Sequence, residues 1–112
     1  MNVTIEQVKN GLSAYIDSEI APMLEGWERI GFCSAAVLIL RKLPLIFDQY
    51  KNNNFVKMLG VIDEKDNIDL DALRDAVASY LKEEHIDIPI IKRRMKVTGK
   101  DLDKLYNMIK EA

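Results

Sequence analysis

The chain has 112 residues, 48% of them apolar, which is enough to form one domain with a hydrophobic core. Sixteen basic and eighteen acidic side chains give a formal charge of −2, which argues against electrostatic capture of nucleic acid or anionic lipid. The single cysteine, Cys33, excludes an intrachain disulfide and suits a reducing compartment. The sequence therefore predicts one compact, soluble domain over residues 1–112.

The first segment is predicted to form an amphipathic helix over about residues 5–20. Thr4 and Gln7 have the spacing of a capping box, and apolar residues then recur every three or four positions. Pro22 and Gly26 indicate a break after this helix. A secretory signal would instead begin with a basic segment and an apolar stretch. We therefore expect the protein to be cytoplasmic.

Residues 30–40, IGFCSAAVLIL, contain no charged side chain and are predicted to form the central, most buried helix. Trp27 opens this second segment. Pro44 removes one backbone donor, so a kink or restart is expected near residues 40–44, and continuity of the helix through Pro44 stays open. Eleven residues rise about 16 Å as a helix, whereas a bilayer core is about 30 Å thick. Extension to Phe47 would bring Arg41 and Lys42 into the membrane, so we expect no membrane contact.

The next part of the chain alternates short elements with polar connectors. A polar linker at residues 51–54 leads to a short helical turn that Gly60 can close in the left-handed conformation. Val61 and Ile62, the acidic turn DEKDN and then Ile68 predict a very short hairpin. Asp69 caps a helix that extends to about residue 84, with acidic residues in its first turn.

Residues 86–97, IDIPIIKRRMKV, change to an alternating pattern that predicts a small β-hairpin. Thr98 and Asp101 form a second capping pair, and one apolar face follows in the last helix. The predicted fold class is mainly α (α+β). Four principal helices pack around the central apolar helix, and a small β-hairpin precedes the C-terminal helix.

The residues that carry chemistry do not form a recognised site. An EF-hand register that starts at Asp63 puts Lys65 at a ligand position and Ile68 where the turn glycine belongs, so calcium is not expected. Cys33 and His85 have no metal-ligand spacing, and the isolated glycines form no phosphate loop. We predict no metal, no cofactor, no catalytic residue and no enzymatic activity. A small hydrolase whose carboxylates are assembled by the fold stays as a third hypothesis.

Two surfaces are candidates for contact with other molecules. A helix that is apolar on every side is hard to cover in so small a domain, which predicts self-association or docking of another protein. The predicted interface residues are Trp27, Leu38, Ile39, Leu40 and Phe47. One local basic cluster resembles a nucleic-acid-contacting wing, although charges that protect a hairpin edge are favoured over DNA contact. The residues of that cluster are Lys92, Arg93, Arg94, Lys96 and Lys100.

Several stretches, which together span most of the chain, carry a resemblance in their arrangement: VKNGLSAYIDSEIAPML, NNNFVKMLGVID, NIDLDALRDAV, IDIPI and DLDKLYNMIK. They resemble a group of small, uncharacterised proteins that prophages and mobile elements of Gram-positive bacteria encode. The resemblance implies a phage-linked origin and cytoplasmic synthesis, and it supplies no catalytic or binding residue. The favoured hypothesis is a non-enzymatic, prophage-encoded interaction or assembly protein. The alternative is a DNA-binding regulator that uses the basic hairpin over residues 92–100.

Overall fold

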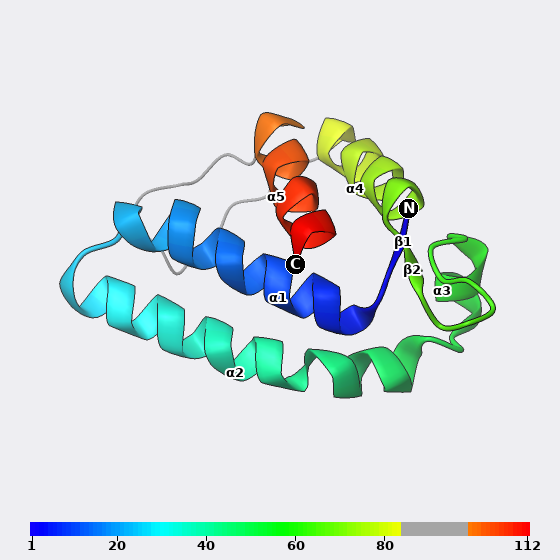
Figure 1. The fold of residues 1–112 in the computed structure, drawn as a ribbon, viewed down its shortest axis with the longest axis horizontal. Helices are drawn as coiled ribbons and strands as arrows, with labels where there is room; N and C mark the ends of the chain where they lie inside the picture. The colour runs from blue at the N-terminus through cyan, green and yellow to red at the C-terminus, as the bar shows by residue number, and fades with distance from the viewer. Residues whose placement is uncertain (84–98) are drawn as a thin grey trace.

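A computed structural model of the chain describes residues 1–83 and 99–112, and the fold is mainly α with a small β part, as predicted. Figure 1 shows α1 between α2 on one side and α5 on the other, with α4 beside α5. The elements in chain order are β1 (Asn2–Val3), α1 (Ile5–Tyr15), the π-helical turn η1 (Ile16–Ile20), the 3-10 turn η2 (Ala21–Met23), α2 (Gly26–Tyr50), α3 (Asn54–Met58), β2 (Ile68–Asp69), α4 (Leu70–Glu83) and α5 (Gly99–Glu111).

Helix α1 begins at the capping box that the sequence predicts. The backbone N–H of Gln7 donates to Thr4 Oγ1 at 3.1 Å, and the Thr4 N–H donates to Gln7 Oε1 at 3.1 Å. Gly11 lies where α1 meets α5, and a Cβ added there would lie 2.5 Å from the Cα of Ile109. Because a backbone atom cannot move aside cheaply, the close approach of α1 to α5 requires glycine at this position.

The hydrophobic core lies among α1, α4, α5 and the two short strands. Leu70 and Val3 are each 1% exposed, and Ile109 is 2% exposed. The apolar stripes of α1, α4 and α5 supply most of this core, which is why their periodic spacing predicts them correctly. The buried members of the core cluster are Val3, Val8, Ile68, Leu70, Leu102, Tyr106 and Ile109.

The β part joins the N-terminus to the segment before α4. Strands β1 and β2 are antiparallel, with Asn2 opposite Asp69 and Val3 opposite Ile68. The sequence did not predict β1. An isolated bridge between Ile62 and Ile68 agrees with the very short hairpin predicted around the acidic turn.

Helix α2 corrects the prediction of a central buried helix. None of its 25 residues is buried, and Figure 1 shows it as an outer helix that runs along α1. It continues unbroken from Gly26 through Pro44 to Tyr50, so the helix does not restart at the proline. Its position has a physical cause: α5, with α4 beside it, already occupies the other side of α1, which leaves α2 one long helical neighbour. A helix with one neighbour buries only the stripe that faces it.

The caps of the shorter elements also follow the sequence. Asn53 Oδ1 accepts the N–H of Phe55 at 2.9 Å at the start of α3, and Gly60 has the left-handed φ of 66° that was predicted for it. Asp69 Oδ1 accepts the N–H of Ala72 at 3.2 Å and so caps α4. The hairpin predicted over residues 86–97 and the Thr98 cap lie outside the described residues.

Candidate interaction surface

The outward side of α2 presents large apolar side chains to water. Trp27 is 87% exposed, Leu38 58% and Ile39 59%. Single exposed apolar residues are ordinary on protein surfaces, whereas several of them along one helix make a candidate contact surface. The large apolar residues exposed on α2 are Trp27, Ile30, Val37, Leu38, Ile39, Leu45, Ile46 and Tyr50.

The opposite side of α2 packs against the rest of the chain through a half-buried stripe. Leu43 and Phe47 pack against the main core, and Phe32 packs against the small cluster of Ile20 and Leu24. The stripe, spaced by three or four residues, consists of Phe32, Ala36, Leu40, Leu43 and Phe47. The predicted interface set is therefore divided: Trp27, Leu38 and Ile39 are exposed, whereas Leu40 and Phe47 belong to the half-buried stripe.

A second stripe runs along the outward side, and we call it the outer stripe. Its residues follow one another at steps of three or four and so share one face of the helix: Trp27, Ile30, Ser34, Leu38, Arg41 and Leu45. A shallow, open depression lined by Cys33, Ser34, Val37 and Leu38 lies beside its middle. A Cβ added at Gly31 would meet nothing within 4 Å, so the fold of the chain leaves this place open. The outer stripe therefore has bulky ends and a small-residue centre.

The unbroken α2 also removes one of the two arguments against a membrane. Among residues 1–83 and 99–112 it is the one helix long and apolar enough to cross a bilayer, with a mean hydropathy of 1.9 over 18 residues. Its 25 residues rise about 37 Å, which exceeds the 30 Å of a bilayer core. The argument from charge stands, because any such window contains Arg41 and Lys42. A core helix of a soluble protein can have the same length and composition, but such a helix is mostly buried and α2 has no buried residue.

The acidic loop before β2 is organised by Asp63. Its Oδ1 accepts the N–H groups of Lys65 at 2.8 Å and Asn67 at 2.9 Å, and its Oδ2 accepts from Asn2 Nδ2 at 2.6 Å. These bonds, led by the one from Asn67, hold the pKa of Asp63 below its usual value. Within the described residues no group of three His, Cys, Asp or Glu side chains gathers at a metal-binding distance. The Asp63 carboxylate thus ties the loop to the N-terminal strand.

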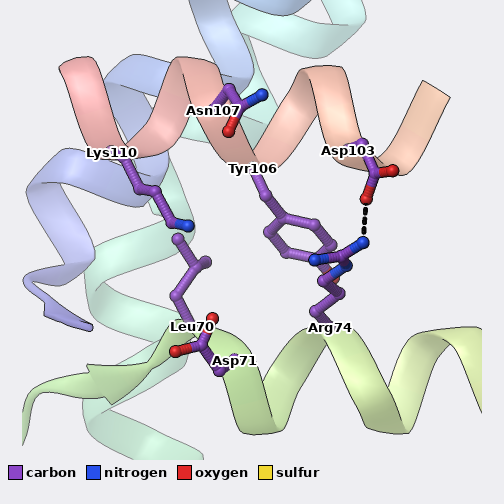
Figure 2. Close-up of a pocket in the computed structure, with 7 residues that line it drawn as sticks. All are labelled: Leu70, Asp71, Arg74, Asp103, Tyr106, Asn107 and Lys110. Atoms are coloured by element: carbon purple, nitrogen blue, oxygen red, sulfur yellow. Dashed lines mark ion pairs between the residues drawn. The ribbon is translucent and has the colours of Figure 1, made fainter. Parts of the chain in front are cut away.

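A polar cleft of about 220 Å³ lies between α4 and α5 (Figure 2). Arg74 reaches from α4 to form an ion pair with Asp103 on α5, beside the ring of Tyr106. The N-terminal amine lies 2.9 Å from Asp71 Oδ2, which lowers the pKa of that carboxyl group. Burial raises the pKa of Tyr106, although Arg74 opposes the shift. The charges that line this cleft join α4 to α5 and to the N-terminus.

The predicted basic cluster and histidine fall mainly in the undescribed segment. Lys92, Arg93, Arg94, Lys96 and His85 lie outside the described residues, whereas Lys100 is exposed in the first turn of α5. Of the two predicted contact surfaces, α2 is the one that lies entirely within the described residues. No family model, curated protein or solved structure matches this chain.

Proposed function

We propose that this protein is a non-enzymatic interaction protein that docks on another polypeptide through the outer stripe of α2. The observation that supports the proposal is that α2 has no buried residue and exposes eight large apolar side chains, four of which, Trp27, Ile30, Leu38 and Leu45, belong to the outer stripe. Full burial of one such side chain stabilises a complex by about 1.5–3 kcal/mol. A partner that covers several of them would gain a substantial part of its binding free energy there.

The chain does not need the outer stripe for its own core. Val3, Leu70 and Ile109 are buried without it, and α2 reaches the main core only from its other side, through Leu43 and Phe47. The outer stripe is therefore free for a partner while the fold stays intact. Large apolar patches of this kind on small proteins are characteristic of protein contacts.

The sequence adds a biological setting to the proposal and also supplies its alternative. The resemblance to prophage-encoded proteins suggests a role in phage assembly or regulation in the cytoplasm. The alternative of a DNA-binding regulator depends on the cluster that runs from Lys92 to Lys100, and no observation on the described residues favours it. Docking by α2 is the better supported of the two functions.

Site-specific photo-crosslinking tests the proposed docking. A photoreactive amino acid replaces Leu38 in the outer stripe, and the matched control replaces Asn10, which is exposed on α1. We expect protein adducts from position 38 and none above background from position 10 when the protein is irradiated in its producing cell. Adducts with lipid alone, or equal yields at the two positions, would contradict the proposed function.

A further inference from the structure

We propose that the partner of the outer stripe is a second copy of this chain, packed antiparallel about a two-fold axis at Ser34. This inference rests on the proposed function, because it names the occupant of the same surface. Two-fold homodimers use one surface twice, so each residue must suit its counterpart on the other side of the axis. The outer stripe meets that condition from Trp27 to Arg41, whereas the counterpart of Leu45 is Met23, which lies before α2 begins.

The first argument is the pattern of side chains on either side of Ser34. Ile30 and Leu38 lie four residues before and after it, and both are more than half exposed. Trp27 and Arg41 lie seven residues before and after it. In the antiparallel pair, Ile30 of one copy therefore meets Leu38 of the other, and Trp27 meets Arg41.

The small residues at the centre of the outer stripe also favour a two-fold axis at Ser34. Ser34 of each copy meets Ser34 of the other at the axis, and Gly31 lies opposite Val37 in this register. Small residues at a helix crossing allow the helix axes to approach to the lower end of the usual range of about 8–10 Å. The shallow depression beside Ser34 and Leu38 leaves the centre of the stripe open to the second copy. Small residues thus lie where the copies come closest, and large ones lie on either side.

The charge on the outer stripe also favours antiparallel packing over parallel packing. Arg41 is the one charged residue of the outer stripe. In the antiparallel pair its guanidinium lies over the Trp27 indole of the other copy, a favourable cation–π arrangement. In a parallel pair each Arg41 would face the other. Antiparallel packing puts the two Arg41 residues about 21 Å apart, beyond the Debye length of about 8 Å in physiological salt.

The dimensions of α2 set the expected affinity. In this register residues 26–42 of the two α2 helices lie side by side over about 25 Å, which with a contact width of about 10 Å offers roughly 250 Å² on each copy. A stable interface of standard size buries about 800 Å² on each partner. We therefore expect a weak, reversible dimer that dissociates at about 10–100 µM.

A membrane is the competing occupant, and the charges disfavour it. Arg41 and Lys42 lie within about 6 Å of the middle of α2, where a bilayer-spanning helix would hold them in hydrocarbon. In the dimer Arg41 contacts an indole at the margin of the interface and keeps access to water. The outer stripe therefore fits a second copy better than it fits a bilayer.

Engineered cysteines test the register in a Cys33→Ala background. We expect Ser34→Cys to form a disulfide-linked dimer under mild oxidation, because residues at the axis come within the 4.4–6.8 Å Cα separation that a disulfide needs. Trp27→Cys alone and Arg41→Cys alone should form no disulfide-linked dimer, whereas their mixture should form a disulfide-linked mixed dimer. Circular dichroism of each reduced variant checks that it is folded.

Three results would overturn the inference. Self-linked dimers of Trp27→Cys and of Arg41→Cys would indicate parallel packing. Failure of Ser34→Cys to cross-link, with position 38 photo-crosslinked to a different protein, would reject the dimer and keep the proposed function. Failure of Ser34→Cys to cross-link, with the wild-type chain sedimenting on phospholipid vesicles and lipid-only adducts at position 38, would reject both.

Discussion

Helices α5 and α2 differ in how their apolar residues are distributed, and this difference decides which of them is buried. Helix α5 carries an apolar stripe with polar residues around it, and Leu102, Tyr106 and Ile109 in that stripe are all buried. Helix α2 is richer in apolar residues, yet none of its residues is buried. The comparison teaches that one concentrated stripe, rather than a high apolar content, directs a helix into a small core.

Truncation of a core side chain should give the largest change in the free energy of unfolding. We expect Ile109→Ala to reduce the free energy of unfolding by about 2–5 kcal/mol, because it leaves a cavity at a residue that is 2% exposed. The matched variant Ile39→Ala, at a position 59% exposed on α2, should change it by about 0.5 kcal/mol or less. Urea denaturation at low protein concentration measures both values. Equal losses would contradict the division between core and outer helix.

Two glycines inside helices, Gly11 in α1 and Gly31 in α2, extend the comparison between core and outer helix. We expect Gly11→Ala to destabilise the chain by about 1–3 kcal/mol, because the added methyl group would overlap the backbone of Ile109. Gly31→Ala should instead stabilise the monomer by up to about 1 kcal/mol, since it improves helix propensity in open space. Thermal and urea unfolding of both variants tests the sign of each change. Destabilisation by Gly31→Ala to the same extent would show that α2 is packed on its outer side.

Removal of the ion pair across the polar cleft should lower the free energy of unfolding by a smaller amount. Arg74 and Asp103 are each about half exposed, so solvent screens their attraction. We expect Arg74→Ala to cost about 0.2–1 kcal/mol, with most of that loss absent in 1 M salt. A double-mutant cycle with Asp103→Ala isolates the pair. A coupling free energy that does not respond to salt would contradict the exposed character of the cleft.

The smallest effect concerns the acidic loop and depends on pH. Because the pKa of Asp63 is lowered in the folded state, its contribution to stability is fully present above its unfolded pKa of about 4. That contribution is lost as the pH falls through the lower folded value. We expect the protection factors of the β1 amides, corrected for the intrinsic exchange rate at each pH, to fall in acid in the wild type, and Asp63→Asn should weaken this dependence. An unchanged acid response in the variant would contradict the anchoring role of Asp63.

The sequence contains enough information to place most helices, because their signals are local. Thr4 with Gln7 and Asp69 before α4 are caps that depend on residues two or three positions away. The β1–β2 pair could not be predicted in this way, because it joins Val3 to Ile68 across 65 positions. Strand pairing over such a separation has no local signature, and a two-residue strand has no measurable period.

The location of α2 and the division of its residues were predicted less well, for different reasons. The uncharged run over residues 30–40 indicates a helix but not which side faces a neighbour, since it has no polar face. The sequence did contain a signal that separates Leu40 from Leu38: Leu40 shares its helical stripe with Leu43 and Phe47. Grouping by stripe rather than by hydrophobicity would have assigned Leu40 and Phe47 to the side that faces the core.

Trp27 provides the most direct measurement of the central claim, because it is the single tryptophan of the chain and is 87% exposed in the monomer. We expect its fluorescence to shift to shorter wavelength, and its quenching by iodide to fall, as the protein concentration rises through about 10–100 µM. Light scattering should show the mass rise from one chain to two over the same range. An exposed, fully quenchable Trp27 with a mass of one chain at every concentration would contradict self-association through α2.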